Sequence, residues 1–338
     1  MTIIMDTHIH SKASDGMWTP KEVVKQAKSR GLEAIALTDH DTTLGIPEAL
    51  EAGKEINLRV IPGIEIDAEH EKGDVKVVDI ELLGLQIDPA KIQPFVDKRA
   101  ESRLRSLEFY VSAFNLYINS PDFETRNKNM KYQLQNPSGI STGMIISWRN
   151  EIDNYPNPKP FLSKWDIVYY ILEKFSINSE AVAKILLGDK LCSTEFKDEY
   201  HFLFEGKEKK PSFFEAIEAV KKAEGLAVLA HPGTSRGYKK GMAKEWELDE
   251  KGWFSESPEK FTPYLFVKEL AGKGLDGVEM YYYEGSDPHH GRMQHTINEY
   301  FRKMAEKLGL MTTYGSDCHG PKGKGPLMGL FGSESIYL

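Results

Sequence analysis

Short apolar runs alternate with amphipathic segments along both ends of this chain. The apolar runs have the length and composition of buried strands, and the segments between them carry helix-capping signals such as Thr19-Pro20 and Ser212 with Glu215. Strands that alternate with helices are typical of an α/β fold with a parallel sheet. The strand-like runs cover residues 3–5, 34–37, 59–64, 75–85, 226–230, 277–281 and 310–314.

The middle of the chain follows a different pattern. From about residue 97 a charged helix is followed by a stretch rich in Asn, Pro, Ser and Tyr, and helical periodicity returns near 165–175 and 179–187. We therefore predict an α/β domain formed by residues 1–96 and 206–338, interrupted by a mainly helical insertion at 97–205. The 338 residues are enough for an α/β barrel with such an insertion.

Polar residues gather where the predicted strands end. In α/β folds the carboxyl ends of parallel strands meet at one edge, where active sites form. Imidazole and carboxylate groups together are good ligands for divalent metals, so their convergence predicts a site for several ions. The candidate metal ligands and catalytic residues are His8, His10, Asp15, His40, Glu65, His231, Asp317 and His319.

Composition narrows the class of protein. Apolar residues make up 40% and charged residues 28%, which is typical of a folded globular chain. The net charge of −8 argues against a broad nucleic-acid-binding or anionic membrane surface and against a stable nucleic-acid partner, and we expect a small substrate or a strand end. Without a signal peptide or a membrane span in the sequence, we expect a cytoplasmic protein, whose oligomeric state the sequence does not indicate. Two cysteines are too few for a disulfide framework.

The motifs together resemble those of the polymerase and histidinol phosphatase (PHP) domain family. The resemblance rests on His8-x-His10 with Asp15-Gly16, Thr38-Asp39-His40, Gly63-Ile64-Glu65, Ala230-His231-Pro232 and Ser316-Asp317-Cys318-His319. It is strongest to the stand-alone phosphoesterases, among them the nucleoside 3′,5′-bisphosphate phosphatases, and it covers about 1–90 and 211–338.

This resemblance implies a distorted seven-stranded (β/α) barrel, related to the TIM barrel, that holds two or three divalent ions of Mn, Fe or Zn. His8, His10, Glu65 and Asp317 would hold one ion; Glu65 would bridge to a second ion on His231, and Asp15, His40 and His319 would hold a third. The family usually has a histidine before the Leu-Gly pair of the fourth strand, and here Glu81 takes that place. A carboxylate oxygen also binds such metals, so Glu81 is a further candidate ligand.

Residues near the expected site are candidates for supporting roles. Phosphate usually meets cationic groups, which singles out Arg99, Arg103, Arg236 and His290 as candidate substrate residues. Asp6 and Asp39 are candidate acceptors that orient ligand imidazoles. His70 lies among charged residues and is expected in an exposed loop.

The sequence leads to one main hypothesis and leaves alternatives open. The main hypothesis is a metal-dependent phosphoesterase that hydrolyses a small phosphomonoester, such as a nucleotide, by attack of a metal-bridged hydroxide, with the insertion as a substrate cap. The alternative is a metal-binding regulatory or structural module whose catalysis was weakened by Glu81. Among enzymes, histidinol phosphatase and exonuclease activities stay open.

Overall fold

The computed structural model describes residues 3–72, 75–77, 80–130, 133–155, 157, 162, 164–175, 209–234, 263–281, 288–321, 328–329 and 331–338. Its contacts divide the chain into two compact units, Met1–Asp97 with Lys210–Leu338, and Lys98–Lys209. No helix among the described residues is long and apolar enough to span a membrane.

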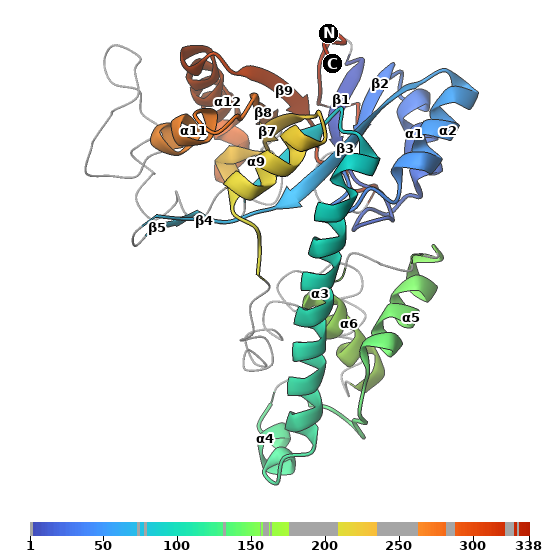
Figure 1. Cartoon of the computed structure of the whole chain (residues 1–338). Coiled ribbons are helices and arrows are strands. Elements are labelled where there is room, and N and C mark those ends of the chain that lie inside the picture. Colours follow the sequence, from blue (N-terminus) through green and yellow to red (C-terminus); the bar gives the residue numbers. More distant parts are fainter. Residues whose placement is uncertain are drawn as a thin grey trace. The chain divides into compact units, whose positions relative to one another are not determined.

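The first unit is built on a seven-stranded sheet that is nearly closed into a barrel (Figure 1). Its strands follow in the order β1 (Met5–Ile9), β2 (Ala34–Leu37), β3 (Arg59–Asp67), β6 (Glu81–Leu85), β7 (Leu226–Leu229), β8 (Gly277–Tyr281) and β9 (Met311–Gly315). The two ends of the sheet meet, since the Thr7 hydroxyl donates to the carbonyl of Tyr314 at 3.0 Å. The structure thus confirms the predicted α/β barrel.

One strand runs against the others. β6 pairs antiparallel with both β3 and β7, whereas the remaining neighbours in the sheet pair in parallel. The prediction of parallel strands throughout is therefore wrong at this strand. The predicted strand at 75–85 is divided into two: β5 (Val75–Val77) pairs with β4 (His70–Lys72) in a separate hairpin, and β6 begins at Glu81. Because no crossover helix lies between β3 and β6, the chain returns in the opposite direction.

Helices pack on the outside of the sheet. They are α1 (Pro20–Ser29), α2 (Ile46–Ile56), α9 (Phe213–Lys222), α11 (Pro263–Ala271) and α12 (Pro288–Leu308), with the short 3₁₀ helix η2 (Pro232–Thr234) after β7. α1 and α9 begin with the predicted capping boxes, in which Thr19 and Ser212 accept from the backbone N–H groups of Glu22 and Glu215. The caps fix where each helix starts after its loop.

The strands have two differently filled sides because successive side chains alternate. Ile64, Leu82 and Val278 point outward into the apolar layer under α9, α11 and α12. Inside the barrel, one end is closed by a cluster of buried apolar residues. This apolar end contains Met5, Ala34, Ala36, Ile61, Leu83, Leu85, Val228 and Leu338, and the same cluster continues along the chain to Ala230, whose N–H donates to the carbonyl of Glu81.

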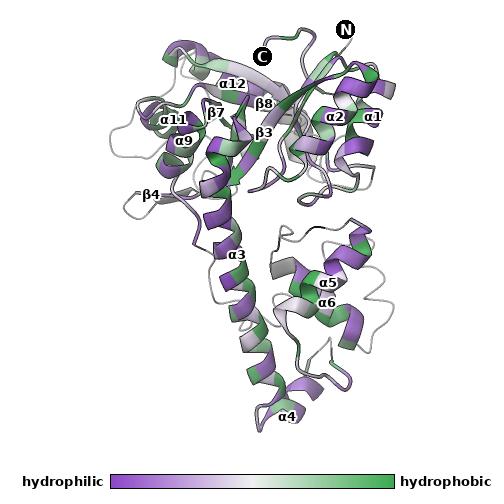
Figure 2. Ribbon diagram, turned by 45° about the vertical axis from the view of Figure 1, so that its right-hand side comes forward, coloured by the Kyte–Doolittle hydropathy of each residue, from purple (hydrophilic) through white to green (hydrophobic). Residues whose placement is uncertain are grey.

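The second unit is helical. It contains most of α3 (Pro89–Ile118), together with α4 (Phe123–Lys128), α5 (Thr142–Asp153) and α6 (Lys164–Phe175). Figure 2 shows hydrophobic and hydrophilic residues on opposite sides along α3. Its buried residues Leu107, Val111 and Phe114 recur at helical spacing and pack with Ile167 and Ile171 of α6. The unit therefore has a hydrophobic core of its own.

Candidate metal centre

The nine predicted ligands come together at the end of the barrel interior opposite the apolar end. Most of them follow the carboxyl end of a parallel strand, as predicted. Glu81 is instead the first residue of β6, and it reaches the same end because that strand is antiparallel. Their donor atoms form three groups, each within 4.8 Å: His8, His10, Glu65 and Asp317; His10, Asp15, His40 and His319; and Glu65, Glu81 and His231.

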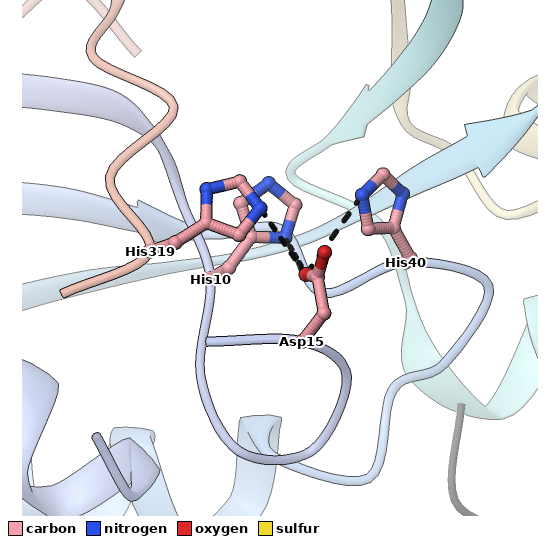
Figure 3. Close-up of side chains that lie close together, drawn as sticks. All are labelled: His10, Asp15, His40 and His319. Carbon is pink, nitrogen blue, oxygen red and sulfur yellow. Dashed lines mark ion pairs between the residues drawn. The ribbon is translucent and has the colours of Figure 1, made fainter. Parts of the chain in front are cut away.

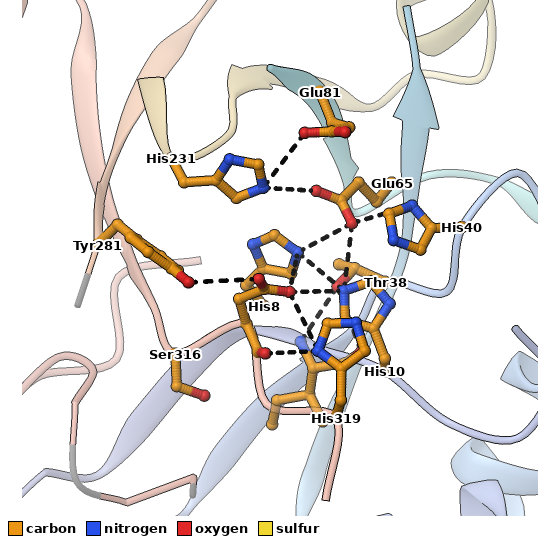
Figure 4. A network of polar contacts seen from close by, with 12 residues as sticks. His8, His10, Thr38, His40, Glu65, Glu81, His231, Tyr281, Ser316 and His319 are labelled. Atoms are coloured by element: carbon orange, nitrogen blue, oxygen red, sulfur yellow. Dashed lines mark hydrogen bonds and ion pairs between the residues drawn. The ribbon is translucent and has the colours of Figure 1, made fainter. Parts of the chain in front are cut away.

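The first set, here called the central group, is tightly packed, and the side chains of His8, His10 and Glu65 in it are completely buried. The Nε2 atom of His10 lies 3.0 Å from Oδ1 of Asp317 and 3.2 Å from Oε2 of Glu65. The Nε2 atom of His8 lies 3.2 Å from the same Glu65 oxygen and 3.1 Å from Nε2 of His10. All four side chains therefore bring a donor atom to one place. Figure 4 shows the rings of His8 and His10 beside the carboxylate of Glu65.

The second set, the Asp15 group, uses the other nitrogen of His10. Oδ1 of Asp15 lies 3.2 Å from Nε2 of His319, 3.7 Å from Nδ1 of His10 and 3.9 Å from Nε2 of His40 (Figure 3). Asp15 is held by a tight loop in which Gly16 donates its N–H to the carbonyl of Ser11. A side chain at Gly16 would come within 2.6 Å of the His10 backbone, so this loop requires glycine.

The third set, the Glu81 group, shares Glu65 with the central group. The Nε2 atom of His231 lies 3.1 Å from Oε1 of Glu65 and 3.4 Å from Oε2 of Glu81. Glu65 thus has one oxygen in each group. His231 has a φ of 25°, a conformation that side chains rarely adopt and that is concentrated at functional sites.

Charge and burial oppose each other strongly in these groups. Burial disfavours the charged form of His10, but the nearby carboxylates of Asp317 and Glu65 outweigh it and raise its pKa to about 10. In the same way, burial is outweighed by Glu65 and Glu81 at His231, whose pKa rises to about 9. Burial and the negative charge of Glu65 raise the pKa of Glu81 to about 8, against the opposing effect of His231.

The donor atoms fit divalent cations. Glu65 Oε2 lies 3.2 Å from a ring nitrogen of each of His8, His10 and His40, yet this buried oxygen makes no hydrogen bond within the described chain. Lone pairs that face each other at this spacing repel unless protons or a cation lie between them. Ligand atoms bound about 2.0–2.2 Å from a tetrahedral ion lie about 3.3–3.6 Å apart, close to the spacing in the central group.

The loops that carry the ligands are fixed by buried carboxylates. Asp6 accepts from the N–H and hydroxyl of Ser316, at 3.0 and 2.6 Å, and from the His8 N–H. Asp39 accepts from the N–H and hydroxyl of Ser11 and from the hydroxyl of Ser14, all at 2.7 Å. These two carboxylates orient backbone and hydroxyl groups, so the prediction that they orient imidazoles is wrong.

A third buried carboxylate at the site, that of Glu279, was not identified from the sequence. Glu279 of β8 is fully buried, and its Oε1 lies 3.0 Å from Nδ1 of His8. Val278 and Met280 point into the outer apolar layer, so a period of two places Glu279 inside the barrel. This alternation is the signal in the sequence that could have revealed it.

The remaining predicted residues lie elsewhere. His70 is buried in β4 with its ring against Phe214 and Phe266, so the expectation of an exposed loop is wrong. Arg99 and Arg103 are buried in the helical unit, where they donate to the carbonyls of Lys209 and Leu162. Arg236 and the side chain of His290 lie outside the described residues.

The chain is similar in sequence to proteins of a known family. A family model described as the PHP domain matches residues 6–188. The phosphoribosyl 1,2-cyclic phosphate 1,2-diphosphodiesterase of Eggerthella lenta is 25% identical over 97% of this chain and 98% of its own length. The 3′,5′-nucleoside bisphosphate phosphatase of Chromobacterium violaceum is 39% identical over 26% of this chain and 29% of its own length.

A solved structure shares the fold. It is described as a metal-dependent phosphoesterase from Bifidobacterium adolescentis, and it aligns with a TM-score of 0.60 and 24% identity over 96% of this chain and 90% of that one. The likeness extends over both units of the chain, including the residues of the insertion.

Proposed function

Because this chain belongs to the PHP domain family of metal-dependent phosphoesterases, we propose that it hydrolyses a small phosphomonoester, of nucleotide type, at the polar end of its barrel. The observation that carries the proposal is the sharing of ligands. Glu65 directs one oxygen to the central group and the other to the Glu81 group, and His10 directs one nitrogen to the central group and the other to the Asp15 group. Shared ligands are typical of catalytic centres with several ions close together.

Some residues of the site would bind the metal ions, and others hold the ligand-bearing loops in place. The central group and the groups on either side would hold two or three divalent ions, of Mn, Fe or Zn. Such ions lower the pKa of bound water and neutralise the charge that develops on a phosphoryl group. The protein provides closely spaced donors, buried positions that exclude bulk water, and loops fixed by Asp6 and Asp39.

Substrate recognition is proposed for the insertion. Residues 97–205 would cover the substrate, and Arg99, Arg103, Arg236 and His290 are the candidate phosphate contacts. The Chromobacterium relative supports a nucleotide-like substrate, since its printed activity is on a nucleoside bisphosphate.

A second substrate class is favoured by the length of one match. The Eggerthella relative matches nearly the whole chain, insertion included, and acts on a cyclic phosphate of a phosphorylated ribose. A cyclic sugar phosphate is therefore the second candidate. A metal-binding module without catalysis is the alternative of another class, and it would follow if Glu81 prevented formation of a working centre.

Phosphate release from a defined panel tests these proposals. The panel contains a nucleoside 3′,5′-bisphosphate, a ribose 1,2-cyclic phosphate 5-phosphate, histidinol phosphate and a 5′-phosphorylated oligonucleotide, each offered after chelation and after Mn²⁺ addition. We expect Mn²⁺-dependent hydrolysis of the first compound with the highest kcat/KM. A higher kcat/KM for the cyclic phosphate, histidinol phosphate or the oligonucleotide would overturn the proposed nucleotide substrate in favour of that compound. No turnover of any compound would favour the non-catalytic module.

A further inference from the structure

The described strands around the polar end all supply a candidate ligand or lead into one, except β8. Instead, β8 presents Glu279 and, two residues later on the same side, Tyr281. The Tyr281 hydroxyl donates to Oδ2 of Asp317 at 3.4 Å. The Tyr281 ring packs edge-on against His231 (Figure 4), with the ring centroids 5.3 Å apart. β8 therefore supplies no candidate ligand itself but contacts the candidate ligands His8, Asp317 and His231.

Glu279 contacts two residues of the site through its carboxylate. Oε1 lies 3.0 Å and Oε2 3.2 Å from Nδ1 of His8, and Oε2 also accepts the backbone N–H of His231 at 2.8 Å. One contact reaches the central group and the other reaches the Glu81 group. The carboxylate is completely buried, so water does not compete for either contact.

The contact with His8 decides which ring nitrogen is available as a ligand. A carboxylate oxygen only accepts hydrogen bonds, so the proton of the neutral His8 ring lies on Nδ1. The lone pair is then on Nε2, the atom that faces Glu65 and Asp317. A carboxylate behind a ligand histidine fixes its tautomer and orientation in this way.

The contact with His231 fixes a backbone that is otherwise unfavourable. The residue has a φ of 25°, and its N–H would have no acceptor in the buried interior if the carboxylate were removed. The direction of the His231 ring toward Glu65 and Glu81 depends on that backbone conformation.

The following strand leaves room for this carboxylate. Gly315 of β9 lies so close to it that a Cβ atom there would overlap Oε1 of Glu279 and Cβ of His8. A glycine at this position is therefore required by the packing of Glu279 on His8. This provides a second way to disturb the contact without changing Glu279.

We propose that Glu279 is a positioning residue that couples two metal positions, by holding His8 in the Nδ1-protonated tautomer and the His231 backbone in its strained conformation. The inference rests on the proposed metal-dependent function. It distinguishes the central and Glu81 groups from the Asp15 group, of whose side chains none contacts Glu279 in the described structure.

The sharpest test is Glu279→Gln, which keeps the size of the side chain. An amide has one acceptor oxygen. If that oxygen takes the place of Oε2, 2.8 Å from the His231 nitrogen and 3.2 Å from Nδ1 of His8, the NH₂ group takes the place of Oε1, 3.0 Å from Nδ1 of His8. If its NH₂ group faces His8, the ring must accept at Nδ1 and carry its proton on Nε2, where it blocks ligation. We expect the variant to fold and to bind Mn²⁺ about 10–100-fold more weakly at the central and Glu81 groups.

Metal binding to chelator-treated protein is measured by isothermal titration and elemental analysis, beside Glu218→Gln as the matched control. Glu218 is an exposed carboxylate on α9, paired with Lys222. Zinc-loaded samples are compared by ¹⁵N NMR of the imidazoles, which reports the tautomer of His8. Loss of affinity together with a changed His8 signal in Glu279→Gln supports the proposal, and so does partial recovery in Glu279→Asp.

The possible results distinguish a failure of the proposed metal-dependent function from a failure of the proposed role of Glu279. If the wild-type protein binds no metal, the proposed function fails. If the wild type binds metal and Glu279→Gln matches Glu218→Gln in affinity and in the His8 signal, only the role of Glu279 is overturned. Should Glu279→Gln not fold, Gly315→Ala applies the test: unchanged metal affinity in a folded Gly315→Ala variant also overturns the proposal.

Discussion

The two ends of the barrel interior are built from the same strands but have opposite chemistry. At one end Met5, Leu85 and Val228 pack in a buried apolar cluster, and at the other end the continuations of the same strands carry His8, Glu81 and His231. The apolar end gains free energy from burial. The polar end places carboxylates and imidazoles in a buried site, which costs free energy unless protons or cations balance them. The comparison teaches that one end stabilises the fold and the other uses that stability to hold the site.

The largest expected effect is on catalysis at the polar end. His10→Ala removes the residue that belongs to two groups at once, through Nε2 and Nδ1. We expect kcat/KM for the best phosphate ester to fall by more than about 100-fold, while the far-ultraviolet circular dichroism stays unchanged. Steady-state kinetics with Mn²⁺ measure this. Activity within a factor of two of the wild type would show that these groups are not catalytic.

The converse change is made at the apolar end. Leu85 is fully buried and pairs with Gly63 and Leu226. Leu85→Ala should lower the free energy of unfolding by about 2–5 kcal/mol, because it removes buried apolar surface and leaves a cavity. Urea denaturation measures the loss, and the number of bound metals should not change. If metal content fell with stability intact, the two ends would not be separable.

Features that repeat along the chain could be predicted from the sequence, whereas features that depend on a single strand or residue could not. The ligand motifs were predictable because polar residues follow one apolar run after another, and the PHP resemblance is confirmed by the family match. The antiparallel course of β6 was not predictable, since Leu82-Leu83-Gly84 has no mark of strand direction. Glu279 was missed because a single carboxylate in an apolar strand resembles a surface residue until its neighbours are placed.

His70 shows the limit of local composition. Its charged neighbours in sequence indicated that the side chain is exposed to solvent. In the structure its ring contacts Phe214 and Phe266, which belong to helices far along the chain. Contacts over such sequence separation leave no local signal. Similarly, the weak periodicity of the insertion gave no indication that Leu107 and Phe114 of α3 would pack with Ile171 of α6.

A smaller effect is expected at the edge of the polar end. Glu81 stands where the sequence resemblance implies a histidine, and its carboxylate lies 3.4 Å from Nε2 of His231. Glu81→Ala should lose about one metal equivalent, whereas Glu81→His should keep it and bind Zn²⁺ relatively better than Mn²⁺, because nitrogen is the softer donor. Elemental analysis after competition between the two metals measures this. Full metal content in Glu81→Ala would make Glu81 a bystander.

The smallest effect concerns the pH dependence of the metal-free protein. Burial raises the pKa of Glu81 to about 8, and carboxylate neighbours overcome burial to raise the pKa of His231 to about 9 and that of His10 to about 10. Raised pKa values in the folded state stabilise it at low pH, and this stabilisation is lost as pH rises through them. The lowered pKa values of Glu65 and Asp317 act only at more acidic pH.

We therefore expect the Tm of chelator-treated protein to fall between about pH 6 and pH 9. Metal binding requires deprotonated ligands, so the rise in Tm on adding Mn²⁺ should grow over the same range. Differential scanning calorimetry at four pH values measures both quantities. A metal-free Tm that rises with pH would contradict the proposed balance of charges at the polar end.

The number of metal ions in the purified protein tests the central claim most directly. Shared ligands at Glu65 and His10 predict at least two equivalents of transition metal per chain by elemental analysis. Their removal by chelation should abolish phosphate release and lower Tm, because ions bound only by the folded chain stabilise it. Less than one equivalent after growth and purification with Mn²⁺, together with unchanged Tm and activity after chelation, would contradict the account.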